Sequence, residues 1–327
     1  MQSRYKFWLG ISLLVIFVGF LWWRGILHTR YAILSPKGSV EKKELPYEKY
    51  SFEKLAMRGG VASTIEVIGD KFYYRSEGRR ISGEINKPEG EIKGIVVMAR
   101  GYVDKAVYRT GLGTHNGAVY YAKNGYITYA PDFSGYGESD VEDENALGAR
   151  LVKPVEILDL IASLSQDKPI FLWGHSNGGQ IMLSVSEILG KRHLTGSVPV
   201  KYVRGVTLWA PVSKPFPYNI LYYSDDASDS GKWLRGEISN FEKDYDVFDY
   251  SIDKYLDWIN IPVQLHQGSM DEAVPQKWSD DLAKNLKEKE KELNYYIYPG
   301  ADHNMRPNWD SVVARDVEWM NKLAEVK

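Results

Sequence analysis

The chain beyond residue 91 alternates short apolar runs with longer segments in which apolar residues recur at helical spacing. The short runs are rich in branched side chains, which is typical of buried parallel strands, and the longer segments indicate amphipathic helices. Such alternation predicts a mostly parallel sheet with helices on both faces. The strands are expected at residues 94–99, 126–130, 170–173, 203–209, 263–266 and 295–298, and the helices at 115–123, 152–164, 179–189, 276–293 and 309–323.

Shorter β-rich runs precede this alternation. Residues 63–68, 71–74 and 80–85 are expected to be antiparallel strands, and a Pro-Gly turn follows the last of them. The polar stretch before them, at residues 31–60, contains EKKELPYEKY and indicates a tether. The sequence therefore predicts a folded domain over residues 61–327.

The amino terminus departs from this globular pattern. From Phe7 to Trp23 the chain carries no charge, and a segment of about 17 residues reaches across the hydrocarbon core of a bilayer. The paired tryptophans at its end suit the membrane interface. Because no small-residue cleavage site follows, the pattern favours an uncleaved single-pass membrane anchor over residues 1–30 rather than a removed signal peptide. Basic residues on both sides leave its orientation open.

The composition limits which partners and which catalytic chemistry are expected. The 327 residues are 44% apolar, enough for a substantial core, and 41 basic against 43 acidic side chains leave a formal charge of −2. No long basic run is present, so nucleic acid is not an expected partner. The absence of cysteine excludes disulfides, thiolate metal sites and a cysteine nucleophile.

One junction between an expected strand and an expected helix carries a nucleophile pattern. The stretch KPIFLWGHSNGGQIMLS places Ser176 between Gly174 and Gly178, which is the strand, tight turn and helix setting that gives G-x-S-x-G its meaning. Small residues at these two positions let the strained serine stand above the sheet. The helix begins at once, so the backbone amide of Asn177 is expected to point toward an oxyanion forming near Ser176.

A serine nucleophile needs a histidine base and an acid to orient that base. Among six histidines the best candidate is His303, in the loop after the last expected strand, where parallel strands gather their active sites. For the acid we rank Asp271 first, then Glu272, then Asp302, because a turn-rich run delivers Asp271 after the preceding strand. His266 lies inside a strand and is expected to be packed or hydrogen-bonded. The remaining histidines lie in less suitable places, and they are His28, His115, His175 and His193.

Five motifs together resemble those of the α/β-hydrolases, and in detail the catalytic domain of the prolyl oligopeptidase family and its esterase relatives. They cover about three quarters of the chain and read ISGEINKPEGEIKGIVVMARGY, GYITYAPDFSGYGESD, GHSNGG, HQGSMDEAVP and YPGADHN. The order Ser176, Asp271, His303 is the triad order of that architecture. The resemblance implies an α/β-hydrolase fold without the propeller domain of the large oligopeptidases, which puts their peptide specificity in doubt.

The resemblance also assigns roles around the nucleophile. In that family the loop after the strand at 94–99 supplies a second oxyanion-hole amide, which here implies the backbone N–H of Tyr102 beside that of Asn177. The family's His-Gly is replaced by Arg100-Gly101, and we expect Arg100 to pair with an acidic side chain below the site. Asp132 and Ser139 are expected to be architectural.

An insertion at about residues 212–259 interrupts the strand and helix rhythm, and in such folds an insertion here generally forms a cap. Its many aromatic rings are expected mostly to pack the cap onto the sheet, with two or three lining an apolar pocket. The acidic excess of this insertion is expected to be a solvated face.

The expected function is that of a membrane-anchored serine hydrolase, which cleaves an ester or a peptide or amide bond of a small molecule or short peptide through an acyl-enzyme. No cofactor is needed, and no metal ligand set is evident. Two alternatives stay open: a non-catalytic α/β-hydrolase-fold binding protein, which normally lacks a triad member, and an acyltransferase that uses the same triad. The sequence does not decide between ester and peptide substrates.

Overall fold

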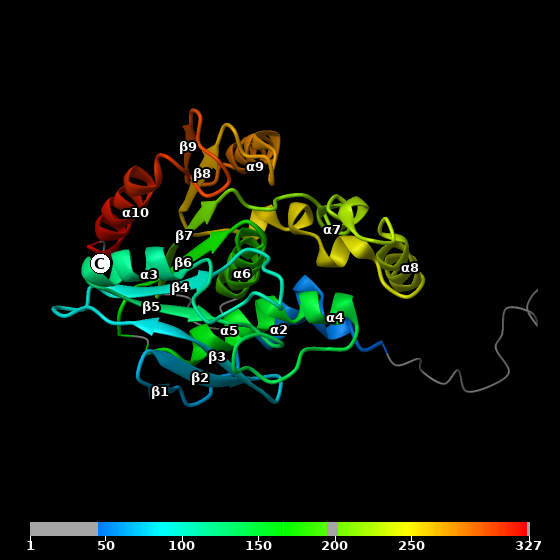
Figure 1. The fold of residues 1–327 in the computed structure, drawn as a ribbon, viewed down its shortest axis with the longest axis horizontal. Helices are drawn as coiled ribbons and strands as arrows, with labels where there is room; N and C mark the ends of the chain where they lie inside the picture. Colours follow the sequence, from blue (N-terminus) through cyan, green and yellow to red (C-terminus); the bar gives the residue numbers. More distant parts are fainter. Residues whose placement is uncertain (1–44, 166, 195–201, 326–327) are drawn as a thin grey trace, which may run out of the picture. The chain divides into compact units, whose positions relative to one another are not determined.

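The computed structural model describes residues 45–165, 167–194 and 202–325, and these hold a sheet of nine strands in the order β1-β2-β3-β5-β4-β6-β7-β8-β9 (Figure 1). The strands are β1 (Glu66–Ile68), β2 (Lys71–Ser76), β3 (Arg79–Asn86), β4 (Gly94–Ala99), β5 (Tyr126–Pro131), β6 (Ile170–His175), β7 (Val203–Trp209), β8 (Val263–Gly268) and β9 (Leu293–Tyr298). The helices are α2 (Phe52–Arg58), α3 (His115–Lys123), α4 (Ala146–Leu151), α5 (Lys153–Ser163), α6 (Asn177–Leu194), α7 (Tyr218–Leu221), α8 (Lys232–Phe241), α9 (Gln276–Glu288) and α10 (Trp309–Ala324).

The sheet is mostly parallel, as the sequence predicts. The first three strands pair antiparallel, and β3 also pairs antiparallel with β5. All pairs from β5 through β4, β6, β7 and β8 to β9 are parallel. The carboxyl ends of these parallel strands therefore lie at one edge, where the loops after β4, β6, β8 and β9 meet.

Successive side chains of the central strands point to opposite faces of the sheet, and this divides the interior into two cores. Ile95 and Val97 of β4 belong to a core that includes residues of α2, α5, α6 and α9. Val96 and Met98, one residue out of phase, belong to a second core with residues of α3 and α10, which lie on the other side of the sheet (Figure 1). Both faces are covered, which is why β4 is buried along its whole length.

Two element boundaries differ from the prediction for local reasons. The helix expected at 276–293 ends at Glu288, because Leu293 already belongs to strand β9. Residues 47–60, which the sequence places in a tether, instead pack on the domain through α2. The side chains of Phe52 and Leu55 are buried in the first core, and the Phe52 ring stacks on Tyr255 at 4.9 Å between centroids. The compact unit accordingly begins at Tyr47.

The predicted anchor from Phe7 to Trp23 lies outside the described residues. Within residues 45–165, 167–194 and 202–325, no helix has the length and apolarity that crossing a membrane requires.

The chain between β7 and β8 forms the insertion, which contains α7, α8 and several 3₁₀ turns. About half of its rings pack: Phe241 contacts Phe216, Tyr245 and Tyr250 at centroid distances of 5.6, 4.5 and 5.0 Å. Five other aromatic side chains of the insertion are exposed, and they are Tyr218, Tyr222, Tyr223, Trp233 and Phe248. At its other end the Tyr223 hydroxyl donates to the Ala273 carbonyl at 3.1 Å, in the loop after β8. The insertion thus reaches the sheet edge where the predicted site residues lie.

Candidate active site

Ser176 occupies the sharp turn between β6 and α6. Its φ of 57° is in the left-handed region, which costs a non-glycine residue strain. Backbone hydrogen bonds hold this conformation, because the Ser176 amide donates to Trp209 O at 2.9 Å and the Ser176 carbonyl accepts from the Val212 amide at 3.0 Å. Strand β7 and the residues after it therefore fix the turn.

The two pattern glycines are required by close backbone approaches. A methyl group on Gly174 would lie 2.4 Å from Gly178 O, and one on Gly178 would lie 2.0 Å from the carbonyl of Ala99 in β4. Gly101, in the loop after β4, also lies close to the nucleophile, since a methyl group there would be 3.0 Å from Ser176 Cβ. The loop that carries Tyr102 therefore passes directly against Ser176.

His303 and Asp271 meet at the same edge of the sheet. His303 Nδ1 donates to Asp271 Oδ2 at 2.8 Å, across the loops that follow β9 and β8. Asp271 Oδ1 accepts the amides of Ala273 and Val274 at 2.9 and 2.8 Å. Burial raises the pKa of Asp271, but the hydrogen bond and charge of His303 and these two amides outweigh it and lower the pKa overall. The fully buried carboxylate is held ionised against a ring that is partly open to solvent.

Neither of the two other candidate acids, Glu272 and Asp302, bonds to the His303 ring. Glu272 is exposed. Asp302 Oδ1 accepts the amides of Asn304 and Arg306 at 2.9 and 2.8 Å, so Asp302 shapes the loop that carries His303 and does not bind its ring. Among the three candidate acids, Asp271 is the one that bonds to the His303 ring.

His175 contributes a contact that the sequence analysis missed. Its Nε2 donates to the His303 carbonyl at 2.9 Å, and the two rings lie 4.5 Å apart between centroids. Burial, and then the charge of His303, lower the pKa of His175 to about 4. A neutral His175 ring therefore adds no positive charge beside the ring of His303. The only sequence signal was the position of His175 beside Ser176 in the chain. From that position we expected its side chain to point away from the site.

Three polar groups near the turn stay available for a ligand. Among the described residues, neither the Ser176 hydroxyl nor the backbone N–H of Asn177 or Tyr102 has a hydrogen-bond partner. The side chain of Tyr102 is 71% exposed, so this loop offers its backbone rather than a packed side chain. Free amides beside a serine are the arrangement that an oxyanion requires.

The expectation that Arg100 pairs with an acidic side chain is wrong. Its buried guanidinium donates to the carbonyls of Gly101 and Asp132 at 2.9 and 3.1 Å and lies 4.3 and 4.1 Å from the ring centroids of Tyr108 and Tyr136. A planar cation suits both contacts, because it donates in its plane and stacks on rings with its face. Arg100 thus secures the loop after β4 through backbone and aromatic contacts.

Asp132 is buried in a structural network, as expected for an architectural residue. Its carboxylate accepts the hydroxyls of Tyr108 and Thr110 at 2.6 and 2.9 Å. His266 is likewise packed inside β8, where its two ring nitrogens bond Tyr298 Oη at 2.8 Å and Asp316 Oδ1 at 2.9 Å. Both sets of hydrogen bonds leave no group free for a substrate.

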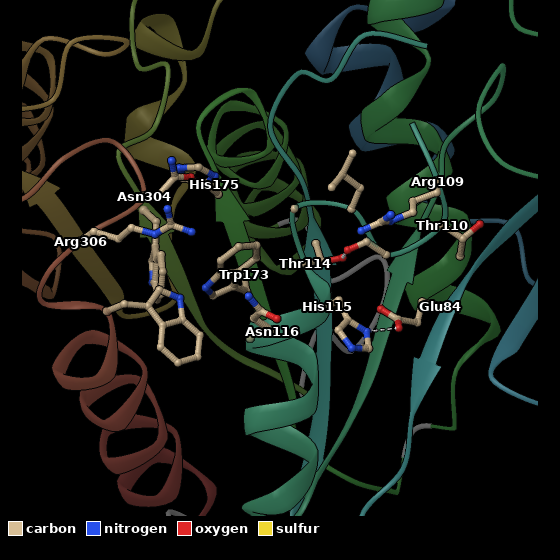
Figure 2. Close-up of a pocket in the computed structure, with 16 residues that line it drawn as sticks. Glu84, Arg109, Thr110, Thr114, His115, Asn116, Trp173, His175, Asn304 and Arg306 are labelled. Carbon is tan, nitrogen blue, oxygen red and sulfur yellow. Dashed lines mark hydrogen bonds and ion pairs between the residues drawn. The ribbon is translucent and has the colours of Figure 1, made fainter. Parts of the chain in front are cut away.

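Two cavities flank the turn. The larger, about 750 Å³, is open between the start of α3 and the loop after β9, with His175, Asn304 and Arg306 on one side and Arg109, Glu84 and His115 on the other (Figure 2). The smaller, about 50 Å³, is bounded by residues of α2, α4, α5, α6 and the insertion. His175 lines the large cavity and Asn177 lines the small cavity. Ser176 lies between these two residues in the chain and lines neither cavity itself.

No cluster of three or more His, Asp or Glu side chains in the described parts of the chain has the arrangement of a metal site.

Comparison with known proteins agrees with this architecture. The profile of the alpha/beta hydrolase fold family matches residues 110–244. Among solved structures, Est1E from Butyrivibrio proteoclasticus, with ferulic acid bound, is 18% identical at a TM-score of 0.56 and covers 77% of this chain and 98% of its own. Acetyl xylan esterase 1 from Thermoanaerobacterium sp. JW/SL YS485 is 15% identical at a TM-score of 0.56, over 85% of this chain and 93% of its own.

A third similar structure is a peptidase. The puromycin-hydrolyzing peptidase of Mycobacterium tuberculosis is 20% identical at a TM-score of 0.53, over 76% of this chain but only 38% of its own. No curated protein matches the chain. At these identities the likeness concerns the fold.

Proposed function

We propose that the chain, which has the α/β-hydrolase fold, is a serine hydrolase that cleaves an ester or amide bond through an acyl-enzyme on Ser176. The observation that carries this proposal is the 2.8 Å hydrogen bond from His303 Nδ1 to Asp271, formed beside a strained serine at the same sheet edge. A base oriented by a buried carboxylate, near a half-buried serine hydroxyl that has no partner among the described residues, is the constellation of nucleophilic acyl transfer.

The chemistry proceeds in two halves. Ser176 Oγ attacks the substrate carbonyl, and its proton passes to His303 Nε2, the ring nitrogen not bonded to Asp271. The tetrahedral oxyanion accepts the amides of Asn177 and Tyr102, each of which contributes about 3 kcal/mol to lowering the barrier. His303 then protonates the leaving alcohol or amine, and water enters by the reverse sequence with His303 as base.

The two cavities suit the two parts of the substrate. The small cavity, on the Asn177 side, takes the acyl group, and the large cavity, on the His175 side, takes the leaving alcohol or amine. A leaving-group site of about 750 Å³ accommodates an aromatic alcohol or an amino-acid residue, so esters and amides are both tested below.

Active-site labelling tests the nucleophile. A fluorophosphonate probe is expected to label the full chain and the control Ser239→Ala, whose serine is exposed on α8, but not Ser176→Ala. A parallel screen of p-nitrophenyl esters and aminoacyl amides decides the bond class. Labelling of Ser176→Ala at the wild-type rate would place the nucleophile elsewhere and overturn the proposal.

Membrane attachment is a separate proposal that rests on the sequence of residues 7–23. The full chain is expected to sediment with membranes and to resist extraction at alkaline pH, whereas a chain that begins at Tyr47 stays in solution. Release of the full chain by alkali would refute the anchor and leave the hydrolase proposal untouched.

A further inference from the structure

Several polar side chains that the proposed catalytic cycle does not use line the small cavity, among them Gln180 and Ser184 of α6 and three that carry the argument below: Arg150, Lys153 and Asn219. Arg150 of α4 and Lys153 of α5 lie three residues apart at the junction of these two helices, and Asn219 comes from α7, in the insertion. Asn177, next to the nucleophile, lines the same space. Apolar side chains complete the wall, and they include Leu55, Ile181, Phe216 and Ile220.

Asn219 is the strongest sign that a ligand belongs here. Its side chain is 2% exposed, and among the described residues neither its Nδ2 nor its Oδ1 has a hydrogen-bond partner. An amide buried in this way costs free energy unless something bonds to it. The position on α7 has no structural use for the amide, so a bound group is the expected partner.

The charge in the cavity is positive. Within the described residues, neither Arg150 nor Lys153 forms an ion pair with a carboxylate, although the structure pairs many of its other cations. Burial, followed by the charges of Arg150 and Arg100, lowers the pKa of Lys153 to about 8. Two cations brought together in a partly desolvated space favour an anion between them.

The acidic neighbours do not remove this excess. Glu142 pairs with Lys105. Burial raises the pKa of Glu156 to about 7, and its Oε2 already accepts the Ser134 amide at 3.2 Å. The Lys153 ammonium lies over the rings of Phe133 and Tyr136, at 5.8 and 5.9 Å from their centroids. The cavity therefore keeps positive charge that no described carboxylate pairs, beside an amide without a partner.

We propose that the small cavity binds a carboxylate at the end of a short acyl chain, so that the preferred substrates are monoesters of short dicarboxylic acids. This inference rests on the proposed function. Arg150 and Lys153 hold the carboxylate, the Asn219 amide donates to it, and the apolar wall contacts the methylene stem. The volume of about 50 Å³ limits the length of the acyl chain. One water needs roughly 10–15 Å³ of such space, so the cavity has room for a carboxylate with two or three methylenes.

A matched pair of esters tests the specificity. Mono-p-nitrophenyl glutarate and p-nitrophenyl pentanoate share chain length and leaving group and differ in the terminal carboxylate. The wild-type kcat/KM is expected to favour the glutarate by about 10- to 100-fold, the range for hydrogen bonds to a charged group. Lys153→Met and Arg150→Leu should each lower this ratio about tenfold, whereas Lys232→Met, which removes an exposed cation of α8, should keep it.

A binding measurement separates this inference from catalysis. In Ser176→Ala, monomethyl glutarate is expected to raise the melting temperature and methyl pentanoate to leave it unchanged, and Lys153→Met added to this variant should abolish the shift. A wild-type ratio near one with normal fluorophosphonate labelling overturns the carboxylate site and keeps the hydrolase. A preference for 4-carboxyphenyl pentanoate over phenyl pentanoate, with no glutarate preference, would move the anion to the leaving group and also overturn it. Loss of labelling together with turnover would instead refute the proposed function.

Discussion

The orphaned amide of Asn219 leads to an unusual prediction: replacing it with leucine stabilises the protein. Leucine has nearly the same shape as asparagine, and the side chain is 2% exposed with no partner for either polar atom among the described residues. Folding therefore removes the amide from water without returning a hydrogen bond. Asn219→Leu ends that loss and places an aliphatic side chain beside Ile220 and Phe216.

The magnitude follows from the cost of a buried unsatisfied group, which is about 1–3 kcal/mol. Part of this is offset by imperfect fit, so we expect a gain of about 1 kcal/mol in the free energy of unfolding. In a domain of this size that gain corresponds to a rise of about 2–4 °C in melting temperature.

The same substitution at a satisfied asparagine serves as the control. Asn145 Oδ1 accepts the amides of Leu147 and Gly148 at the start of α4, and its Nδ2 donates to Glu237 at 2.8 Å. Asn145→Leu removes this helix cap and is expected to cost about 1 kcal/mol. The two variants should thus change stability in opposite directions.

Thermal melts followed by circular dichroism, with and without monomethyl glutarate, provide the assay. Asn219→Leu should melt higher than the wild type without ligand and gain less from the ligand. A loss of more than 1 kcal/mol in Asn219→Leu, similar to that of Asn145→Leu, would show that the amide is satisfied in the folded protein and would refute the reasoning.

Three further predictions concern the site itself. Asp271→Asn should lower kcat for a p-nitrophenyl ester by about 10⁴-fold with little change in KM, because the ring of His303 loses its orienting carboxylate; an effect under tenfold would contradict that role. His175 has a folded pKa of about 4 against about 6.5 when unfolded, so stability is lost as pH falls from 6.5 toward 4, and urea titrations of His175→Phe should show a shallower decline; an unchanged slope would rule out a neutral His175. Gly178→Ala should prevent correct folding, as judged by solubility and circular dichroism, since the new methyl would lie 2.0 Å from a backbone carbonyl; Gly90→Ala, with nothing within 4 Å, should fold normally, and equal yields of the two would refute the steric argument.

Local sequence patterns predicted the bounds of an element best where the segment has the same kind of surroundings on both faces. Strands β4 and β7 and helix α3 have the bounds expected from the sequence, because a run such as GIVVMA is apolar on both faces and fits only a buried strand. The short helix α2 was missed. Its residues Glu53 and Lys54 are exposed, and only contacts with Tyr255 and α6 reveal why Phe52 and Leu55 belong to the core.

The candidate triad was accessible from sequence because each member follows a strand of a parallel sheet. The strand order brings such ends to one edge, so Ser176, Asp271 and His303 could be proposed together without knowledge of any distance. The partners of Arg100 could not be foreseen in the same way. Its guanidinium binds carbonyls and ring faces, and these are present in every sequence without a distinctive signal.

The sequence by itself determined the strand and helix rhythm, the serine turn and the order of the candidate catalytic residues, because hydrophobic periodicity and glycine sterics act over a few neighbouring positions. Only the tertiary structure decided that His303 bonds Asp271, that His175 lies neutral against that ring, and that Arg150, Lys153 and Asn219 share one cavity. Arg150 and Lys153 are close in the chain, but the other groups come from loops and helices that are distant from one another in the sequence. Their burial, charge and lack of partners exist only once the two cores and the insertion have packed around them.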